Sequence, residues 1–135
     1  MITKIAKEDY LFAVDRDKTS RYYASYSRCE CEGCKNFYRQ IRGRFPKLEE
    51  FLREFGINIS KPEEMLWLDD DAHVEYTPYY TVAGNIEKIG SRRICYDGLD
   101  LKFYPSENQE ISIPTERTEP YFVIAVFGIV LPWLA

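Results

Sequence analysis

Residues 92–104, RRICYDGLDLKFY, decide the fold class of this chain. Asp97 and Gly98 are the central pair of a two-residue β-hairpin, because the type I′ turn needs positive φ at both positions. This turn sets the strand register and places Tyr96 opposite Leu99. One face of the hairpin then carries the apolar side chains Ile94, Tyr96, Leu99, Leu101 and Phe103. The other face carries Arg93, Cys95, Asp100 and Lys102.

Period-two patterns predict further strands around this hairpin. From Tyr79 onward the chain alternates, with Tyr80, Val82 and Ile86 on one side and Gly84 marking a bulge. Additional strands are predicted at Tyr10–Val14, around Ile111 and Ile113, and at Tyr121–Phe127. The last of these is apolar on both faces, so we expect it to lie centrally in the sheet.

Two amphipathic helices are predicted in the N-terminal half. The first begins after Gly33 and ends at Gly43, with Phe37, Tyr38 and Ile41 on one face. The second begins at Pro46 and ends at Gly56. Its apolar residues follow the i, i+3, i+4, i+7 rule: Leu48, Phe51, Leu52 and Phe55.

The remaining segments are assigned from local composition. We expect a charged loop at residues 15–20, an extended stretch at 21–27 and an acidic loop at 69–72. Residues 60–63 have the S-x-x-E form of a capping box, which predicts a short helical turn that carries Met65, Leu66 and Trp67 into the core. The expected fold is α+β, with N-terminal helical segments packed on one face of an antiparallel β-meander of about five strands.

Composition limits the class of protein. A length of 135 residues predicts a single globular domain that spans residues 1–135. The chain is 45% hydrophobic and 30% charged, which argues against disorder. Residues 1–10 lack the apolar region of a secretory signal, so we expect cytoplasmic residence and reduced thiols. The apolar stretch at 121–135 is shorter than the roughly 20 residues of a spanning helix, so no membrane partner is expected.

The cysteine cluster is the main candidate site. Cys29, Cys31 and Cys34 have the spacing C-x-C-x2-C, and thiolates are the preferred ligands of structural zinc. Gly33 would allow the tight turn by adopting positive φ. A structural zinc site needs four ligands, and the fourth is Cys95 or His73, the only histidine.

Two other interpretations of the cluster stay open. The thiols are also consistent with ordinary packing, since a free cysteine behaves as a small apolar residue. Alternatively, Cys31 and Cys34 serve thiol redox chemistry, because a helix N-terminus lowers the pKa of a thiol. Glu30 and Glu32 oppose this effect, since nearby carboxylates raise a thiol pKa.

Charged stretches offer weaker candidates. The stretch from Lys35 to Lys47 holds five basic residues and no acidic one, a pattern that also occurs on surfaces that bind nucleic acid or phosphate. The net charge of −4 makes nucleic acid an unexpected partner for the whole chain. Carboxylates and His73 between Asp69 and Glu75 could bind a hard cation, but a solvated acidic loop explains them better.

The cysteine motif also carries a resemblance. The elements C-x-C-x2-C-K-N-F at residues 29–37, F-P at 45–46, L-x-x-F-G-I-x-I at 52–59 and L-P-W-L at 131–134 resemble an uncharacterised bacterial protein family. The resemblance implies a free-standing domain and no particular reaction. No catalytic motif accompanies His73, so enzymatic activity is not indicated. The first hypothesis is a small binding or interaction module with structural zinc, and its partner is unknown or another protein.

Overall fold

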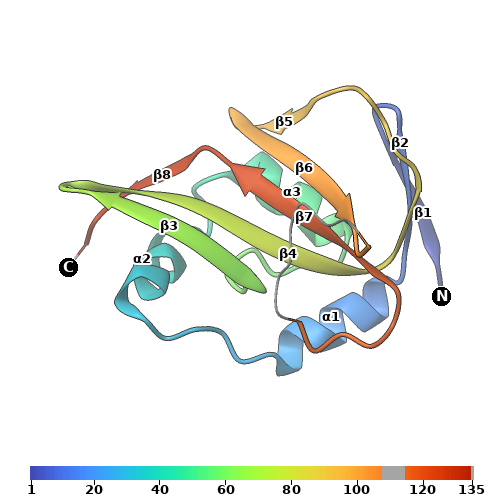
Figure 1. Cartoon of the computed structure of the whole chain (residues 1–135), viewed down its shortest axis with the longest axis horizontal. Coiled ribbons are helices and arrows are strands. Elements are labelled where there is room, and N and C mark those ends of the chain that lie inside the picture. The colour runs from blue at the N-terminus through green and yellow to red at the C-terminus, as the bar shows by residue number, and fades with distance from the viewer. Residues whose placement is uncertain (108–114, 135) are drawn as a thin grey trace.

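The computed structural model describes residues 1–107 and 115–134, and within these ranges it confirms the α+β class (Figure 1). The helices are α1 Arg16–Ser25, α2 Glu32–Gln40 and α3 Pro46–Glu54. The strands are β1 Thr3–Lys7, β2 Tyr10–Val14, β3 Glu64–Asp70, β4 His73–Lys88, β5 Ile94–Tyr96, β6 Leu99–Pro105, β7 Tyr121–Phe127 and β8 Ile129–Pro132. The strand predicted around Ile111 and Ile113 lies outside the described residues.

All of these strands join one antiparallel sheet. Its order is β1-β2-β4-β7-β6-β5, with β3 and β8 paired to β4. The predicted meander therefore needs a correction, because β2 and β7, which are not the sequence neighbours of β4, both lie beside it. The central position expected for β7 is confirmed.

The 16-residue strand β4 changes partners along its length. Its first half pairs with β3 and β8, and its second half with β7 and β2. Gly84 has φ +140°, and a Cβ there would lie 1.9 Å from the carbonyl oxygen of Ala13 in β2. The sequence predicts a bulge at Gly84. The register of the β2–β4 pairing instead shifts further along the two strands, between Leu11 and Phe12 of β2.

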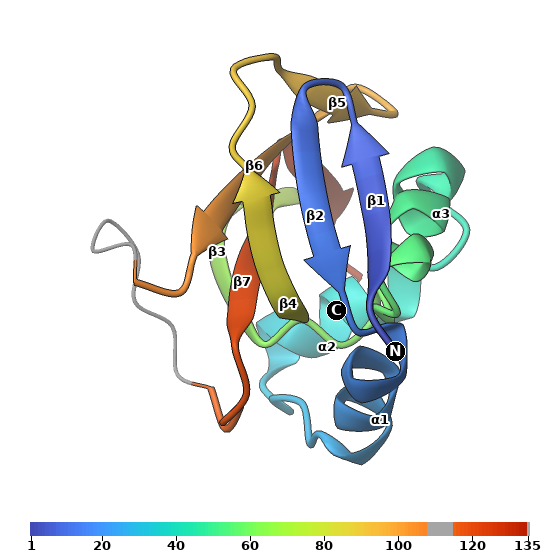
Figure 2. The same cartoon turned by 90° about the vertical axis from the view of Figure 1, so that its right-hand side faces the viewer.

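The helices cover one face of the sheet (Figure 2). The core on that face joins helix residues such as Phe37 and Phe51 with sheet residues such as Phe122 and Ile124. The opposite face has a smaller apolar cluster of Tyr79, Val123 and Ala125. Within the described ranges, no helix is both long enough and apolar enough to cross a lipid bilayer.

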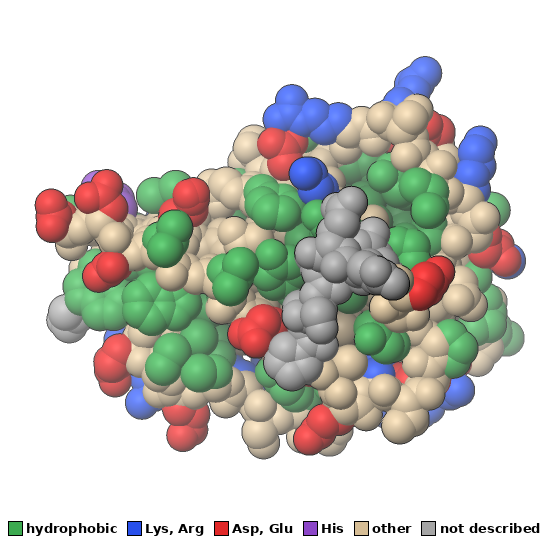
Figure 3. Space-filling model, viewed as in Figure 1, with side chains coloured by type: hydrophobic (Ala, Val, Ile, Leu, Met, Phe, Trp, Pro, Cys, Tyr) green, Lys and Arg blue, Asp and Glu red, His purple; other side chains and the backbone are tan. Residues whose placement is uncertain are grey.

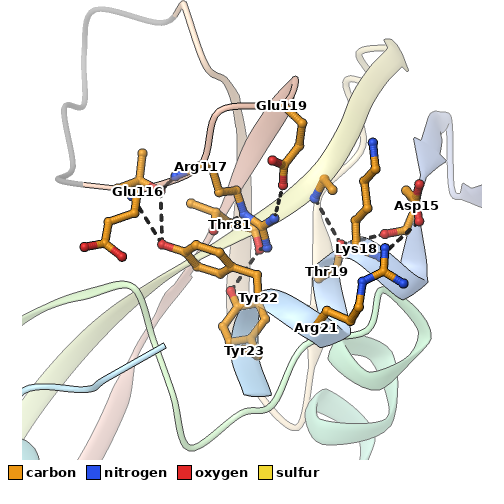
Figure 4. Close-up of polar contacts among 12 residues, drawn as sticks. Asp15, Lys18, Thr19, Arg21, Tyr22, Tyr23, Thr81, Glu116, Arg117 and Glu119 are labelled. Atoms are coloured by element: carbon orange, nitrogen blue, oxygen red, sulfur yellow. Dashed lines mark hydrogen bonds and ion pairs between the residues drawn. The ribbon is translucent and has the colours of Figure 1, made fainter. Parts of the chain in front are cut away.

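The stretch at residues 15–27 differs from its prediction as loop and extended chain. Instead it forms α1, which begins after Asp15. The Asp15 carboxylate accepts a hydrogen bond from the backbone N–H of Lys18 at 3.0 Å, the usual N-cap contact (Figure 4). The charged residues that suggested a loop therefore belong to the first turn of a helix.

A buried arginine joins α1 to the sheet (Figure 4). The side chain of Arg117 is inaccessible to solvent, forms an ion pair with Glu119 at 2.6 Å and donates from Nε to Thr81 Oγ1 at 2.7 Å. Its guanidinium carbon lies 4.1 Å from the ring centroid of Tyr22, and the Tyr23 hydroxyl donates to the carbonyl of Thr81 at 2.9 Å. These distant contacts place the tyrosines in a helix, although tyrosine favours strands.

The helical turn predicted to carry residues 65–67 into the core is also wrong, because residues 64–70 form β3. Met65 is buried, while Leu66 and Leu68 are exposed at 59% and 76%. Trp67 pairs with buried Tyr76 of β4 and so faces the helices. Sequence alone does not distinguish the alternating burial of a strand from one turn of helix in so short a segment.

The hairpin of β5 and β6 is confirmed in register and turn type. Tyr96 lies opposite Leu99, and Asp97 and Gly98 have φ values of +53° and +79°, as a type I′ turn requires. The Asp97 carboxylate also accepts hydrogen bonds from the backbone N–H groups of Lys47 and Leu48 at 2.9 and 3.0 Å. Phe45, the N-cap residue of α3, offers no side-chain cap, so a residue about 50 positions away in sequence caps this helix.

We predict that Asp97→Ala lowers the free energy of unfolding by about 1–2 kcal/mol, because it removes the cap of α3. Asp97→Asn keeps an acceptor oxygen and tolerates the positive φ, so it should cost less than half as much. Urea denaturation of both variants measures the difference. Equal costs for the two variants would contradict a capping role.

Candidate metal centre

The structure brings the three clustered cysteines together. Cys29 and Cys31 lie in the loop between α1 and α2, and Cys34 lies in the first turn of α2. The three Sγ atoms all lie within 4.8 Å of one another. This convergence is what the C-x-C-x2-C spacing predicts. Within the described ranges, no other group of three or more histidine, cysteine and acidic side chains converges in this way.

Sulfur–backbone hydrogen bonds shape the loop. Cys31 is the N-cap residue of α2, and its Sγ accepts a hydrogen bond from the backbone N–H of Cys34 at 3.4 Å. The backbone N–H of Cys31 points to Cys29 Sγ at 3.5 Å. The N-cap acceptor of α2 is therefore a sulfur, where most helices have an oxygen. These two contacts hold the thiols of Cys29 and Cys31 at the start of the helix.

Aromatic residues hold the loop from outside. The Tyr38 hydroxyl donates to the carbonyl of Cys29 at 2.8 Å. The Tyr76 hydroxyl, from β4, donates to the carbonyl of Gly33 at 2.6 Å and accepts from Asn36 Nδ2 at 3.0 Å. The loop is thereby anchored to both the helix and the sheet, and sequence patterns gave no sign of these contacts.

Gly33 has a different role from the predicted one. It lies inside α2 and is not among the residues with positive φ, so the turn does not need its conformational freedom. A Cβ at Gly33 would instead lie 2.2 Å from a ring carbon of Trp67. The missing side chain therefore lets the indole of β3 pack directly on the start of α2.

The three thiols differ in exposure and acidity. Cys34 is 6% exposed, whereas Cys29 and Cys31 are exposed. Burial, together with hydrogen bonds that the Cys34 thiol donates to the sulfurs of Cys31 and Cys29, raises the pKa of Cys34 well above its usual range. Burial also acts against ionisation of Cys31, but hydrogen bonds from the backbone and side chain of Cys34 outweigh it and lower the pKa of Cys31.

The predicted fourth ligands lie outside the cluster. Cys95 is exposed on β5, at the opposite end of the molecule from α2 (Figures 1 and 2), and its thiol donates to Asp100 Oδ1 at 2.9 Å. His73 is exposed at the tip of the β3–β4 hairpin.

The two charged stretches lie largely at the surface. The acidic residues 69–71 lie at the end of β3 and in the hairpin that leads to β4, where all are exposed. In the basic stretch, Lys35 lies 4.0 Å from Glu32, and Arg44 donates to Gln40 at 3.3 Å. These neighbours satisfy part of the stretch within its own helix and turn.

Comparisons with protein-family models, with curated proteins and with solved structures give no match. The resemblance carried by the cysteine motif stays a prediction. The site must therefore be interpreted from its own geometry and chemistry.

The packing of Trp67 on Gly33 yields a prediction. Gly33→Ala should destabilise the protein by about 1–3 kcal/mol, because the new methyl group meets the indole ring. In a Trp67→Ala background, the same change should be neutral or stabilising, since alanine is favoured over glycine within a helix by about 1 kcal/mol. Urea denaturation of the two single variants and the double variant tests this reversal, and an equal cost in both backgrounds would contradict it.

Proposed function

We propose that this chain is a small cytoplasmic binding module whose loop at residues 29–34 holds a zinc ion through the thiolates of Cys29, Cys31 and Cys34. The observation that carries the proposal is the convergence of three sulfurs within 4.8 Å. In a tetrahedral site with Zn–S bonds of about 2.3 Å, sulfurs lie about 3.8 Å apart. Small side-chain rotations therefore suffice to close three sulfurs around one ion.

The partial exposure of the cluster supports a metal site in which one coordination position of the ion is open. Cys34 comes from the protein interior and Cys29 and Cys31 from the surface, so an ion between them would lie at the edge of the fold. The fourth position then belongs to a water molecule or to a group of a bound partner, since neither Cys95 nor His73 is part of the cluster. All four cysteines are free thiols in the structure and so available as ligands.

An exposed apolar surface on the sheet face opposite the helices supports the binding role. Leu66 and Leu68 of β3 and Val130 of β8 are more than half exposed, and Leu68, Glu75 and Val130 form one row across the sheet. Figure 3 shows hydrophobic side chains along β3 and acidic ones at the hairpin tip. An extended protein segment with apolar and basic residues fits this surface.

Zinc analysis tests the proposal directly. Protein exposed to zinc and then desalted should retain about one ion per chain. Cys29→Ser and Cys31→Ser each change an exposed side chain, so the fold should survive while zinc retention is lost. Metal content by mass spectrometry, together with thiol titration before and after chelation, provides the measurement.

Cys95→Ser is the matched control, because it removes a thiol that is bonded to Asp100 away from the cluster. Zinc content should not change in this variant. Metal-free protein in which the thiols of Cys29 and Cys31 react at the rate of Cys95 would overturn the proposal.

A second candidate function is thiol–disulfide exchange at Cys31 and Cys34. The observation that favours it is the pairing of an exposed N-cap thiol with a buried thiol one turn later. The Cys31 thiolate would attack an oxidised small-molecule disulfide and displace one thiolate, and Cys34, after passing its proton to that thiolate, would displace the second. The small molecule gains two electrons as the protein gains a Cys31–Cys34 disulfide.

The acidity of Cys31 gives a prediction for metal-free protein. Since its pKa is lowered and that of Cys95 is raised by the hydrogen bond to Asp100, Cys31 forms thiolate at a lower pH than Cys95 does. The pH profile of iodoacetamide labelling, followed by peptide mass spectrometry, should rise earlier for Cys31. Coincident profiles would count against redox chemistry at this position.

A further inference from the structure

A cleft on the helical side of the molecule is separate from the cysteine cluster. It has a volume of about 410 Å³ and lies among α1, α3, Arg42 and the segment 56–61. Figure 2 shows α1 and α3 on the same side of the sheet, one below the other. This volume is within the range of roughly 300–1,000 Å³ that is typical of small-molecule sites.

Basic side chains dominate the lining of the cleft. Arg16 comes from α1, Arg42 from the turn after α2, Arg53 from α3 and Lys61 from the segment before β3. Glu49 is the one acidic residue in the lining. Four cations and one anion leave three excess positive charges in a chain whose net charge is −4. Such a local excess within an acidic protein favours an anionic ligand.

The Glu49 carboxylate already has two partners within the protein. One of its oxygens accepts from the backbone N–H of Gly43 at 2.9 Å, and the other pairs with Arg53 at 3.2 Å. Within residues 1–107 and 115–134, no carboxylate forms an ion pair with Arg16, Arg42 or Lys61. Three of the four cations therefore carry a positive charge that no described carboxylate neutralises, and this charge is available to a ligand.

The guanidinium groups also keep hydrogen-bond donors. Arg16 donates to the carbonyl of Arg53 at 3.2 Å, and Arg42 reaches Asn58 and Ser60 at the long distances of 3.4 and 3.5 Å. In the described part of the chain these contacts use Nη2 alone. A guanidinium has five N–H donors in a planar fork, so both arginines retain donors suited to two oxygens of a phosphate.

The walls of the cleft are fixed by close packing. The segment at Gly56 passes so near α1 that a Cβ there would lie 2.7 Å from the carbonyl oxygen of Arg16. Lys61 Nζ donates to the carbonyl of Tyr23 at 2.5 Å, which joins the segment to the end of α1. Tyr23, Ile57 and Ile59 border the cleft and are buried, so their positions are fixed by the core. A rigid cleft with basic groups around it is suited to a small anionic ligand.

We propose that this cleft binds a small molecule with two or more phosphate groups, of the size of a nucleoside diphosphate. The three excess charges match a diphosphate, and the volume of about 410 Å³ leaves room for a base or sugar beside it. The site is independent of the zinc proposal, because it shares no residue with the loop at 29–34.

Isothermal titration at about 150 mM salt, where long-range attraction between exposed charges is largely screened, tests the proposal. The probes are ADP, inorganic pyrophosphate, orthophosphate and sulfate. ADP and pyrophosphate should both bind, ADP more tightly because its nucleoside fills more of the cleft, and sulfate should bind at least about tenfold more weakly. Pyrophosphate equal to ADP would identify inorganic diphosphate as the ligand chemistry instead of a nucleotide.

Substitutions locate the binding site. Arg16→Gln and Arg42→Gln should each weaken pyrophosphate binding about tenfold, the effect of a lost charged hydrogen bond. Arg39→Gln removes the same charge from an exposed position of α2 outside the cleft and should change the affinity less than twofold. Thermal denaturation confirms that all three variants fold.

Three results would overturn the proposal: no binding of ADP or pyrophosphate, an equal loss in Arg39→Gln, or sulfate binding as tightly as pyrophosphate. Tighter binding of a single-stranded oligonucleotide than of ADP would also overturn it, in favour of a nucleic-acid surface.

Discussion

The pairing of β4 with four other strands is the constraint on which this structure depends. Its first half joins β3 and β8, and its second half joins β7 and β2. The helical layer lies against the sheet that these pairings create. The cysteine loop depends on the same strand, because Tyr76 of β4 bonds to the carbonyl of Gly33 and pairs with Trp67 of β3. A change in β4 register would therefore alter both the core and the candidate metal centre.

Much of the fold was predictable where short-range chemistry decides. The Asp97-Gly98 turn needs only positive φ at two adjacent residues, and α3 needs only a proline, a helical apolar stripe and a glycine at its end. The predictions failed where distant contacts decide. The tyrosines of α1 are held in a helix by Arg117 and Thr81, which follow them by many residues. Met65 to Leu68 form a strand because β4 lies beside them, and no pattern within four residues reveals a pairing partner.

The candidate site was likewise predictable where short-range spacing decides and not where distant contacts decide. Sequence spacing identified Cys29, Cys31 and Cys34, since sulfurs so close along the chain can meet in one loop. It could not place Cys95, whose position depends on the topology of the whole sheet. The cleft at α1 and α3 was not predicted either, because its cations come from four separate segments, and only Arg42 belongs to the basic stretch that the sequence indicated.

The position of β7 between β4 and β6 has a consequence for synthesis of the chain. β4 and β6 emerge from the ribosome first, and neither can form the backbone hydrogen bonds along its β7-facing edge until β7 has been made. During this interval two apolar strand edges are open to pairing with other nascent chains, which is a route to aggregation. Recovery of folded protein should therefore depend on translation rate and on chaperones that shield extended segments.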